Sequence, residues 1–251
     1  MNAVLSPVWS FFVFVGECLI LLGDSLRRLF TRPREWGEMV QQMAFVGAAS
    51  VPIVALTTFF SGSVLALYTA EILVQYGAGS LSGAAVGLAV SREIAPVLAG
   101  IMVAARCGSA MAAQLGTMAV TEQIDALRAL NVPPTNYLVI PRIVASVLMT
   151  PILCMVGVYA GILGGFLVAV SMGVPEGSFW NSLRQFGEPW DFLGGLIKAA
   201  VFGLIVAVVG CQQGLRTEGG AVGVGKATTN AVVISMVLIY ITNFVLAAIL
   251  Y

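Results

Sequence analysis

Long uncharged runs dominate the chain, and short segments between them carry most of its charges. Five of these runs are long enough to cross a bilayer, because a spanning helix needs about 20 predominantly apolar residues. The pattern predicts transmembrane helices over residues 39–70, 94–118, 143–172, 192–213 and 227–251. The uncharged stretch 72–91 is rich in Gly, Ser and Ala, so we expect a loop with a short helix there. A sixth span over this stretch is the competing topology.

The segment before the first span, residues 5–30, has a different pattern. Its apolar run is interrupted by Glu17 and followed by Asp24, Arg27 and Arg28. The polar residues fall near one helical stripe, which predicts an elbow helix lying in the membrane interface. An uncleaved signal anchor is the weaker alternative, because the basic cluster follows the apolar run and no small-residue cleavage site is evident.

Composition supports an all-α integral membrane protein. The chain has 251 residues, of which 59% are hydrophobic and only 10% charged, whereas soluble domains have about 25% charged residues. Twelve basic and twelve acidic residues cancel, so no net field favours nucleic acid as a partner. The absence of histidine excludes His-based catalysis and removes the commonest metal ligand. The four cysteines stand alone in apolar segments and are expected to be small buried residues.

The distribution of Lys and Arg between the loops predicts the orientation in the membrane. One side holds eight basic residues, namely Arg27, Arg28, Arg32, Arg34, Arg128, Arg142, Arg216 and Lys226. The other side holds Arg92 and Arg184. The N-terminus is therefore expected in the cytoplasm and the C-terminus outside.

Small residues recur at four-residue spacing on three of the predicted spans. These are Ala104, Gly108, Ala112 and Gly116 on the second, Gly157, Gly161 and Gly165 on the third, and Ala199, Gly203 and Ala207 on the fourth. Such stripes let helices approach closely in lipid, so they predict tight packing between spans.

Four charged residues are expected at membrane depth, where an ionisable group is a candidate functional residue. Arg92, Glu93 and Lys198 should lie at a similar depth near the outer leaflet. Two interpretations remain open: a lipid-headgroup cavity with apolar walls, or an ion pair that fixes helix packing. Arg106 is expected to tie its helix to backbone carbonyl groups.

Residues 220–228, GAVGVGKAT, nearly match a phosphate-binding loop. The position that needs Ser or Thr for magnesium is Ala227, and no preceding strand is predicted. We therefore expect no nucleotide site, and interpret the stretch as a flexible cytoplasmic turn.

A short polar helix is predicted over 121–130, between the second and third spans. Thr121 can cap its start, Arg128 suits the negative end of the helix dipole, and Asn131 can close it in a left-handed conformation before Pro133. The apolar residues recur every third position along one edge. Such a helix could rest on the membrane or insert into a groove of another protein.

The sequence SREIAPVLAGIMVAARCGSAMAAQLGTMAVTEQIDALRALNVPPTNYLVIPR, residues 91–142, resembles the signature region of the MlaE (YrbE) permease family. The likeness extends to the N-terminal helix, to LIKAAVFG at 196–203 and to GVGKATTNAVV at 223–233. It covers nearly the whole chain.

This resemblance implies the membrane subunit of an ATP-binding-cassette lipid transporter in a bacterial inner membrane, with phospholipids as the expected cargo. Family members work as homodimers with two cytoplasmic ATPase subunits, which bind ATP and Mg²⁺, so no cofactor is expected in this chain. An MCE-domain lipid-binding protein docks on the outer side. The family fold is an elbow helix followed by five spans.

Carried over by position, the resemblance assigns roles to two groups of residues. Those matching the helix that couples the permease to its ATPase are Glu122, Gln123, Ile124, Asp125, Ala126 and Leu127. Those matching polar residues of the lipid cavity are Arg92, Glu93 and Lys198. Gln114 departs from the family, which usually has Glu there.

Two other function classes are compatible with the sequence. One is a membrane scaffold that recruits a cytoplasmic partner and transports nothing. The other is a small secondary transporter, although such proteins usually have internal repeats and none is evident in this chain.

Overall fold

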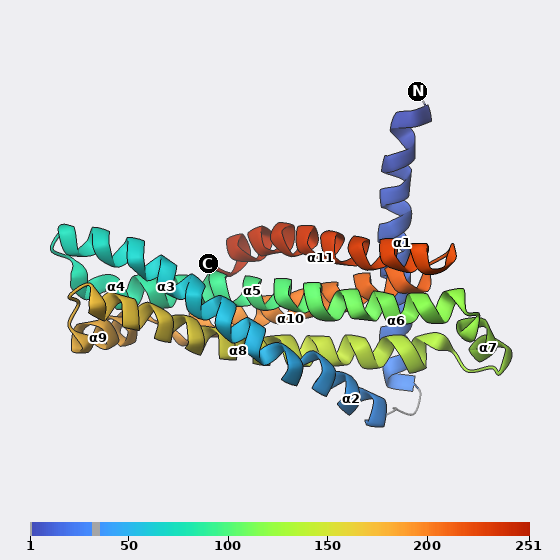
Figure 1. Ribbon diagram of the computed structural model, residues 1–251, viewed down its shortest axis with the longest axis horizontal. Helices are drawn as coiled ribbons and strands as arrows, with labels where there is room; N and C mark the ends of the chain where they lie inside the picture. Colours follow the sequence, from blue (N-terminus) through green and yellow to red (C-terminus); the bar gives the residue numbers. More distant parts are fainter. Residues whose placement is uncertain (1, 32–35) are drawn as a thin grey trace.

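The computed structural model describes residues 2–31 and 36–251, and these residues form helices and turns with no strand among them. The prediction of an all-α protein is confirmed. Figure 1 shows long helices running side by side, with α1 (Asn2–Thr31) crossing them at one end. Arg32 and Arg34, which contribute to the charge asymmetry, lie outside the described residues.

Five helical segments are long and apolar enough to cross a membrane, as predicted. They are Trp36–Gln75, Gly79–Val120, Thr135–Ser171, Pro189–Leu215 and Gly220–Leu250. Among the described residues, no separate sixth span lies over 72–91. The second segment has 42 residues, which corresponds to about 63 Å of helix and so to about twice the hydrocarbon thickness.

Each span is built from one or more helical elements. The first span comprises α2 (Trp36–Val46), η1 (Ala48–Ser50) and α3 (Val51–Gln75). The second span comprises six elements, which are η2 (Gly79–Leu81), α4 (Ser82–Ala89), η3 (Val90–Ile94), α5 (Ala95–Val103), η4 (Ala104–Gly108) and α6 (Ser109–Val120). The polar helix α7 (Gln123–Ala129) connects the second span to the third, which comprises η5 (Thr135–Val139) and α8 (Ile140–Ser171). Helix α9 (Glu176–Phe186) follows, and the fourth and fifth spans are the single helices α10 (Pro189–Leu215) and α11 (Gly220–Leu250). The elements η3, η4 and η5 are π-helical turns.

The second span begins earlier than its hydropathy predicts, at Gly79 rather than at residue 94. Its first part packs against α9, where a side chain at Gly83 would clash with the Phe179 carbonyl oxygen. Gly87 lies in the same way against Leu183. This packing stabilises as helix a segment whose small residues resemble a loop in sequence.

The predicted stripes of small residues are all buried between helices. A side chain at Gly62 of α3 would clash with the carbonyl oxygen of Gly161 of α8. Gly203 of α10 lies equally close to the Ser146 carbonyl oxygen of α8. The spans of one chain therefore use these stripes to bring their backbones into contact.

Helix α1 lies across the ends of the spans (Figure 1), which agrees with the predicted elbow helix. Its Glu17 accepts a hydrogen bond of 2.7 Å from Gln212 and pairs with Arg216 at 3.3 Å. Burial would raise the pKa of the Asp24 carboxyl group, but hydrogen bonds from Arg28 and Thr135, with nearby positive charge, lower it overall. Asp24 thus favours its ionised form where α1 meets η5.

The glycine-rich stretch 220–228 is helical, so the expectation of a flexible turn is wrong. Gly219 and Gly220 have positive φ angles of 81° and 67° and begin α11, and the following residues, including Lys226, form its first turns. Glycine adopts these angles without strain. A phosphate-binding loop would need backbone amides free to face a ligand, and most of these are inside a helix.

Candidate functional site

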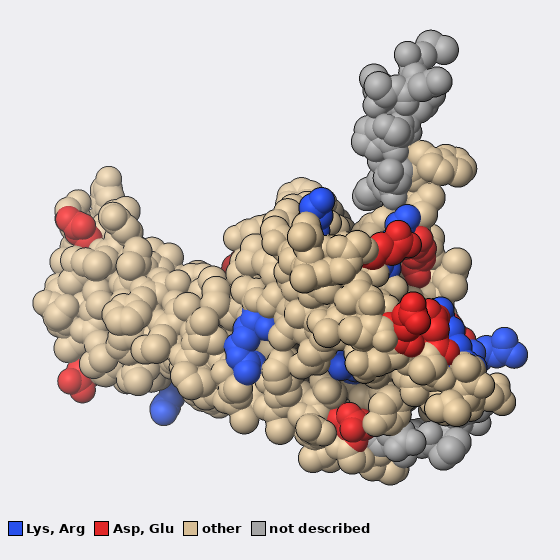
Figure 2. Space-filling view, turned by 45° about the vertical axis from the view of Figure 1, so that its right-hand side comes forward, with Lys and Arg blue, Asp and Glu red and all other residues tan. Residues whose placement is uncertain are grey.

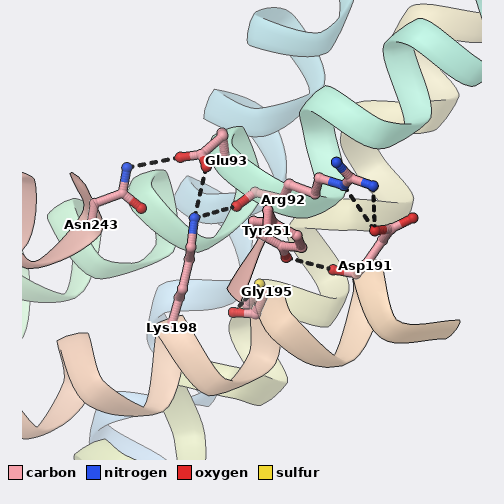
Figure 3. Close-up of polar contacts among 8 residues, drawn as sticks. Arg92, Glu93, Asp191, Gly195, Lys198, Asn243 and Tyr251 are labelled. Atoms are coloured by element: carbon pink, nitrogen blue, oxygen red, sulfur yellow. Dashed lines mark hydrogen bonds and ion pairs between the residues drawn. The ribbon is translucent and has the colours of Figure 1, made fainter. Parts of the chain in front are cut away.

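Arg92 and Glu93 lie in the π-helical turn η3 of the second span. A π-turn inserts an extra residue into a helix, and such turns occur frequently at functional sites. Adjacent side chains in the turn point to different neighbours, as Figure 3 shows: Arg92 towards the start of α10, and Glu93 towards α11. One helical turn therefore connects two other spans.

Lys198 of α10 is completely buried and pairs with Glu93. Its Nζ donates to Glu93 Oε1 at 2.7 Å and to the Arg92 carbonyl oxygen at 3.0 Å. The Tyr251 ring centroid lies 5.1 Å from the same nitrogen. An ammonium group has three N–H donors, so two hydrogen bonds and one aromatic face account for its surroundings.

Asn243 and Tyr251, at the far end of α11, complete the network. Asn243 Nδ2 donates to Glu93 Oε2 at 2.8 Å. The Tyr251 hydroxyl donates to the Asp191 carbonyl oxygen at 3.1 Å, and its ring lies 4.7 Å from the Arg92 guanidinium. These contacts join α11 to both α10 and the second span.

Arg92 is held by Asp191, at the start of α10. The Arg92 guanidinium contacts Asp191 Oδ1 at 2.7 and 2.8 Å, and the other carboxylate oxygen, Oδ2, accepts a 3.0 Å hydrogen bond from the Glu188 backbone N–H. Glu188 and Asp191 form a capping box, with Pro189 in the first turn. The sequence that begins α10 thus also fixes the position of Arg92.

The network contains two basic and two acidic side chains, so its formal charge is zero. Beside it lies a hollow of about 340 Å³, lined by Ser61, Glu93, Ile94, Val97, Leu98 and Asn243. Glu93 retains 43% side-chain exposure. The site therefore presents polar groups next to apolar walls.

The structure brings the three predicted site residues together, but in different settings. Arg92 is 37% exposed, Glu93 is 43% exposed and Lys198 is buried behind them. Sequence reasoning did not assign Asp191, Asn243 or Tyr251 to the site. A search for charges cannot find Asn243 or Tyr251, although an amide inside a long uncharged span is a signal that could have identified Asn243.

Arg106 ties its helix to backbone carbonyl groups, as expected. Its Nη1 donates to the Phe45 carbonyl oxygen at 2.9 Å and to Ser50 Oγ at 3.0 Å. Phe45 lies in the last turn of α2, and Ser50 lies in η1 between α2 and α3. Arg106 therefore joins the second span to the first, away from the Lys198 network.

The predicted coupling residues divide into an inward and an outward set. Ile124 is 4% exposed and packs in a cluster with Leu115 of α6 and Leu138 at the start of the third span, and Leu127 lies against the same cluster. The outward set consists of Glu122, Gln123, Asp125 and Ala126, all exposed. Helix α7 is thus seated on the chain's own core and presents its polar face outward.

The start of α7 differs from the prediction. The Thr121 hydroxyl donates to the Thr117 carbonyl oxygen at 2.7 Å and does not cap the helix. Glu122 takes the N-cap position in a left-handed conformation, with φ of 60°. Asn131 is also left-handed, with φ of 57°, as its place after the helix predicts.

Gln114 contacts Arg142, a buried residue at the start of α8. Arg142 Nη2 donates to Gln114 Oε1 at 3.1 Å, and Nη1 donates to the Leu138 carbonyl oxygen at 2.6 Å. Arg142 Nε has no partner among the described residues. Gln114 therefore supplies a neutral acceptor to a buried cation, at a position where a carboxylate would form an ion pair.

Comparison with known proteins places the chain among membrane permeases. The family model described as "Permease MlaE" matches residues 39–249. A probable ABC transporter permease protein of Rickettsia conorii is 43% identical over all of this chain and 97% of its own length. One from Synechocystis is 43% identical over 84% of this chain and 81% of its own. The Arabidopsis thaliana chloroplast protein named TRIGALACTOSYLDIACYLGLYCEROL 1 is 37% identical over 91% of this chain and 66% of its own length.

Removal of the Glu93 charge should destabilise the protein, because it leaves the Lys198 ammonium buried without a counter-ion. We expect Glu93→Gln to lower the free energy of unfolding by about 3 kcal/mol. Adding Lys198→Met should restore most of this loss. Asp125→Asn, which breaks the exposed Arg128–Asp125 pair, is the control and should cost less than about 1 kcal/mol. Thermal unfolding in detergent measures all four proteins, and equal midpoints for wild type and Glu93→Gln would contradict the prediction.

A carboxylate at position 114 should stabilise the chain through Arg142. We expect Gln114→Glu to raise the free energy of unfolding by about 1 kcal/mol, because hydrogen bonds between charged groups are stronger than those to a neutral amide. Gln114→Met, which removes the acceptor at similar volume, should lower it. Thermal unfolding in detergent measures both variants, and a lower midpoint for Gln114→Glu than for the wild type would show that Arg142 needs no counter-ion.

Proposed function

Because the chain belongs to the MlaE permease family and is a transporter permease subunit, we propose that its cargo is a membrane lipid of the phospholipid class. The observation that carries the proposal is the juxtaposition of a charged network with an apolar-walled hollow. A lipid has a polar headgroup and apolar chains, and both parts find matching surfaces there. The lipid in the printed name of the Arabidopsis relative supports the same cargo class.

ATP hydrolysis is proposed to take place in a separate ATPase dimer that binds ATP and Mg²⁺. The relatives' names as ABC transporter permeases imply an ATPase partner. The exposed face of α7 is the proposed contact, because four of its residues point outward while Ile124 fixes the helix to the chain. Glu122, Gln123, Asp125 and Ala126 then touch the ATPase, and Ile124 and Leu127 transmit its movement.

The seating of α7 suggests a mechanical route to the site. Ile124 shares a buried cluster with Leu115 of α6, and α6 belongs to the same 42-residue span as Arg92 and Glu93. A push on α7 therefore moves the span that carries Arg92 and Glu93, two of the network's four charged side chains. Closure of the ATPase pair would displace Glu93 relative to Lys198 of α10 and change the hollow that Glu93 lines.

The working unit is proposed to be a homodimer with an MCE-domain protein on its outer side. Helix α11 buries a smaller share of its residues than any other described span. Its large exposed apolar residues include Val237, Tyr240, Ile241 and Phe244. Some of this surface contacts lipid, and a closed two-fold dimer would cover the rest.

The chain is a multi-pass membrane protein, and we propose that it lies in the bacterial inner membrane with α7 in the cytoplasm. Figure 2 shows acidic and basic side chains gathered towards the end of the molecule that carries α7, whereas the opposite lobe has few. Arg128, Arg142, Arg216 and Lys226 belong to that end. The α7 end carries more Lys and Arg residues than the opposite end does, which supports a cytoplasmic location for α7 and an outer location for Tyr251.

Reconstitution tests the cargo. The chain with its ATPase, in vesicles containing fluorescent phospholipid, should move lipid in an ATP-dependent manner, and the chain alone should hydrolyse no ATP. Glu93→Gln together with Lys198→Met should reduce lipid movement at least tenfold while the complex still assembles. An assembled complex that hydrolyses ATP but moves no lipid would favour a scaffold or a transporter of another cargo.

A second experiment tests α7 as the ATPase contact. We expect Asp125→Lys combined with Ala126→Asp to abolish copurification of the ATPase, because it reverses a charge and adds another on the exposed face. Membrane insertion should stay unchanged and any loss of thermal stability should be small, since neither residue is buried and the Arg128–Asp125 pair is exposed. Glu218→Lys, an exposed charge reversal between α10 and α11, is the matched control. Copurification of the double variant at the wild-type level would exclude this face.

A further inference from the structure

The hollow beside Glu93 contains a carboxylate with unused hydrogen-bond acceptor capacity, and we infer that it selects lipid headgroups that carry N–H or O–H donors. The inference rests on the proposed lipid transport and specifies which headgroups the site prefers. A headgroup amine or hydroxyl group can donate a hydrogen bond to Glu93, whereas a bare phosphate or a quaternary ammonium group has no donor to offer it.

Both cations of the network are already engaged. Lys198 is 0% exposed and its ammonium group faces Glu93, the Arg92 carbonyl oxygen and the Tyr251 ring. Arg92 is paired with Asp191 and lies against the Tyr251 ring, and it does not line the hollow. Figure 3 shows its side chain pointing away from Asn243. Neither cation is therefore placed to receive a phosphate group in the hollow.

The polar groups that do line the hollow are Glu93, Asn243 and Ser61. A carboxylate can accept about four hydrogen bonds, and Glu93 accepts one from Lys198 and one from Asn243. Asn243 uses its amide nitrogen for Glu93, and its Oδ1 is buried without a partner among the described residues. A ligand donor would satisfy an acceptor capacity that the chain leaves open.

Charge contributes less to this selection than hydrogen bonding does. Lys198 neutralises Glu93 at 2.7 Å, so the pair offers acceptor atoms without a strong net field. Ethanolamine, glycerol and sugar headgroups all carry donors, although their charges differ. Choline carries a positive charge and no donor. Ile94, Val97 and Leu98 form the apolar part of the hollow, against which the first methylene groups of the lipid would lie.

Competition between lipids of identical acyl chains tests the inference. The complete transporter, in nanodiscs with equal amounts of phosphatidylethanolamine, phosphatidylglycerol and phosphatidylcholine, is analysed by native mass spectrometry for bound lipid. We expect the first two lipids to be enriched over phosphatidylcholine by about three- to tenfold, the effect of roughly one hydrogen bond. Phosphatidylethanolamine and phosphatidylcholine are the matched pair, because they differ only in the methyl groups that replace the donors.

A pair of serine variants on α3 localises the effect. Ser61→Ala removes a hydroxyl group from the hollow and should lower the enrichment. Ser63→Ala is the control, because the Ser63 hydroxyl donates to the Phe59 carbonyl oxygen and does not line the hollow. Enrichment that falls for Ser61→Ala and persists for Ser63→Ala supports the inference.

The negative outcomes separate the two levels of the proposal. Equal binding of all three lipids, with ATP-dependent lipid movement intact, would overturn the headgroup inference and leave lipid transport standing. Enrichment of phosphatidylglycerol alone would show selection by negative charge and would also overturn it. A complex that binds and moves none of the three would overturn both.

Discussion

The ammonium group of Lys198 imposes a constraint on three spans at once. A buried charge must be paired and hydrogen-bonded, since an isolated one in an apolar medium costs many kcal/mol. Glu93, the Arg92 carbonyl oxygen and the Tyr251 ring meet this requirement from the second span and from the end of α11. The relative positions of α10, α11 and the π-turn η3 are therefore fixed by one cation.

This network needs helices that approach closely, and small residues make that approach possible. Gly195, one turn before Lys198, lies so near the Ser91 carbonyl oxygen that a side chain there would clash. Gly194 gives the Tyr251 hydroxyl its space, because a side chain would come within 2.5 Å of it. Packing and electrostatics are thus coupled. The glycines set the distance between neighbouring helices, and the charged pairs set how the helices are aligned along their axes.

The end of the molecule that carries α7 shows a similar division between residues that support the helix and residues that are exposed. Ile124 is buried in a cluster with the ends of the second and third spans, whereas Asp125 beside it is exposed. A helix seated in this way can transmit force, because its apolar edge is continuous with the core. Its link to the Lys198 network runs through the long second span, to which both Leu115 and Glu93 belong.

The sequence by itself determined the class of fold, the five spans and the elbow helix, and it identified the charged residues that lie within the apolar runs. These follow from properties that are local in the chain: hydropathy over about 20 residues, small residues at helical spacing and ionisable groups in apolar runs. The family signature at 91–142 added the expectation of a coupling helix.

Only the tertiary structure decided which partners these residues have. Asp191, Asn243 and Tyr251 are 99, 150 and 60 positions from the groups they bond, and no periodicity along the chain encodes such pairs. The helical start at Gly79 and the burial of Ile124 were settled in the same way, by contacts with α9 and with the core. Local sequence reports how a segment interacts with lipid and water, whereas the pairing of buried polar groups depends on how the spans assemble.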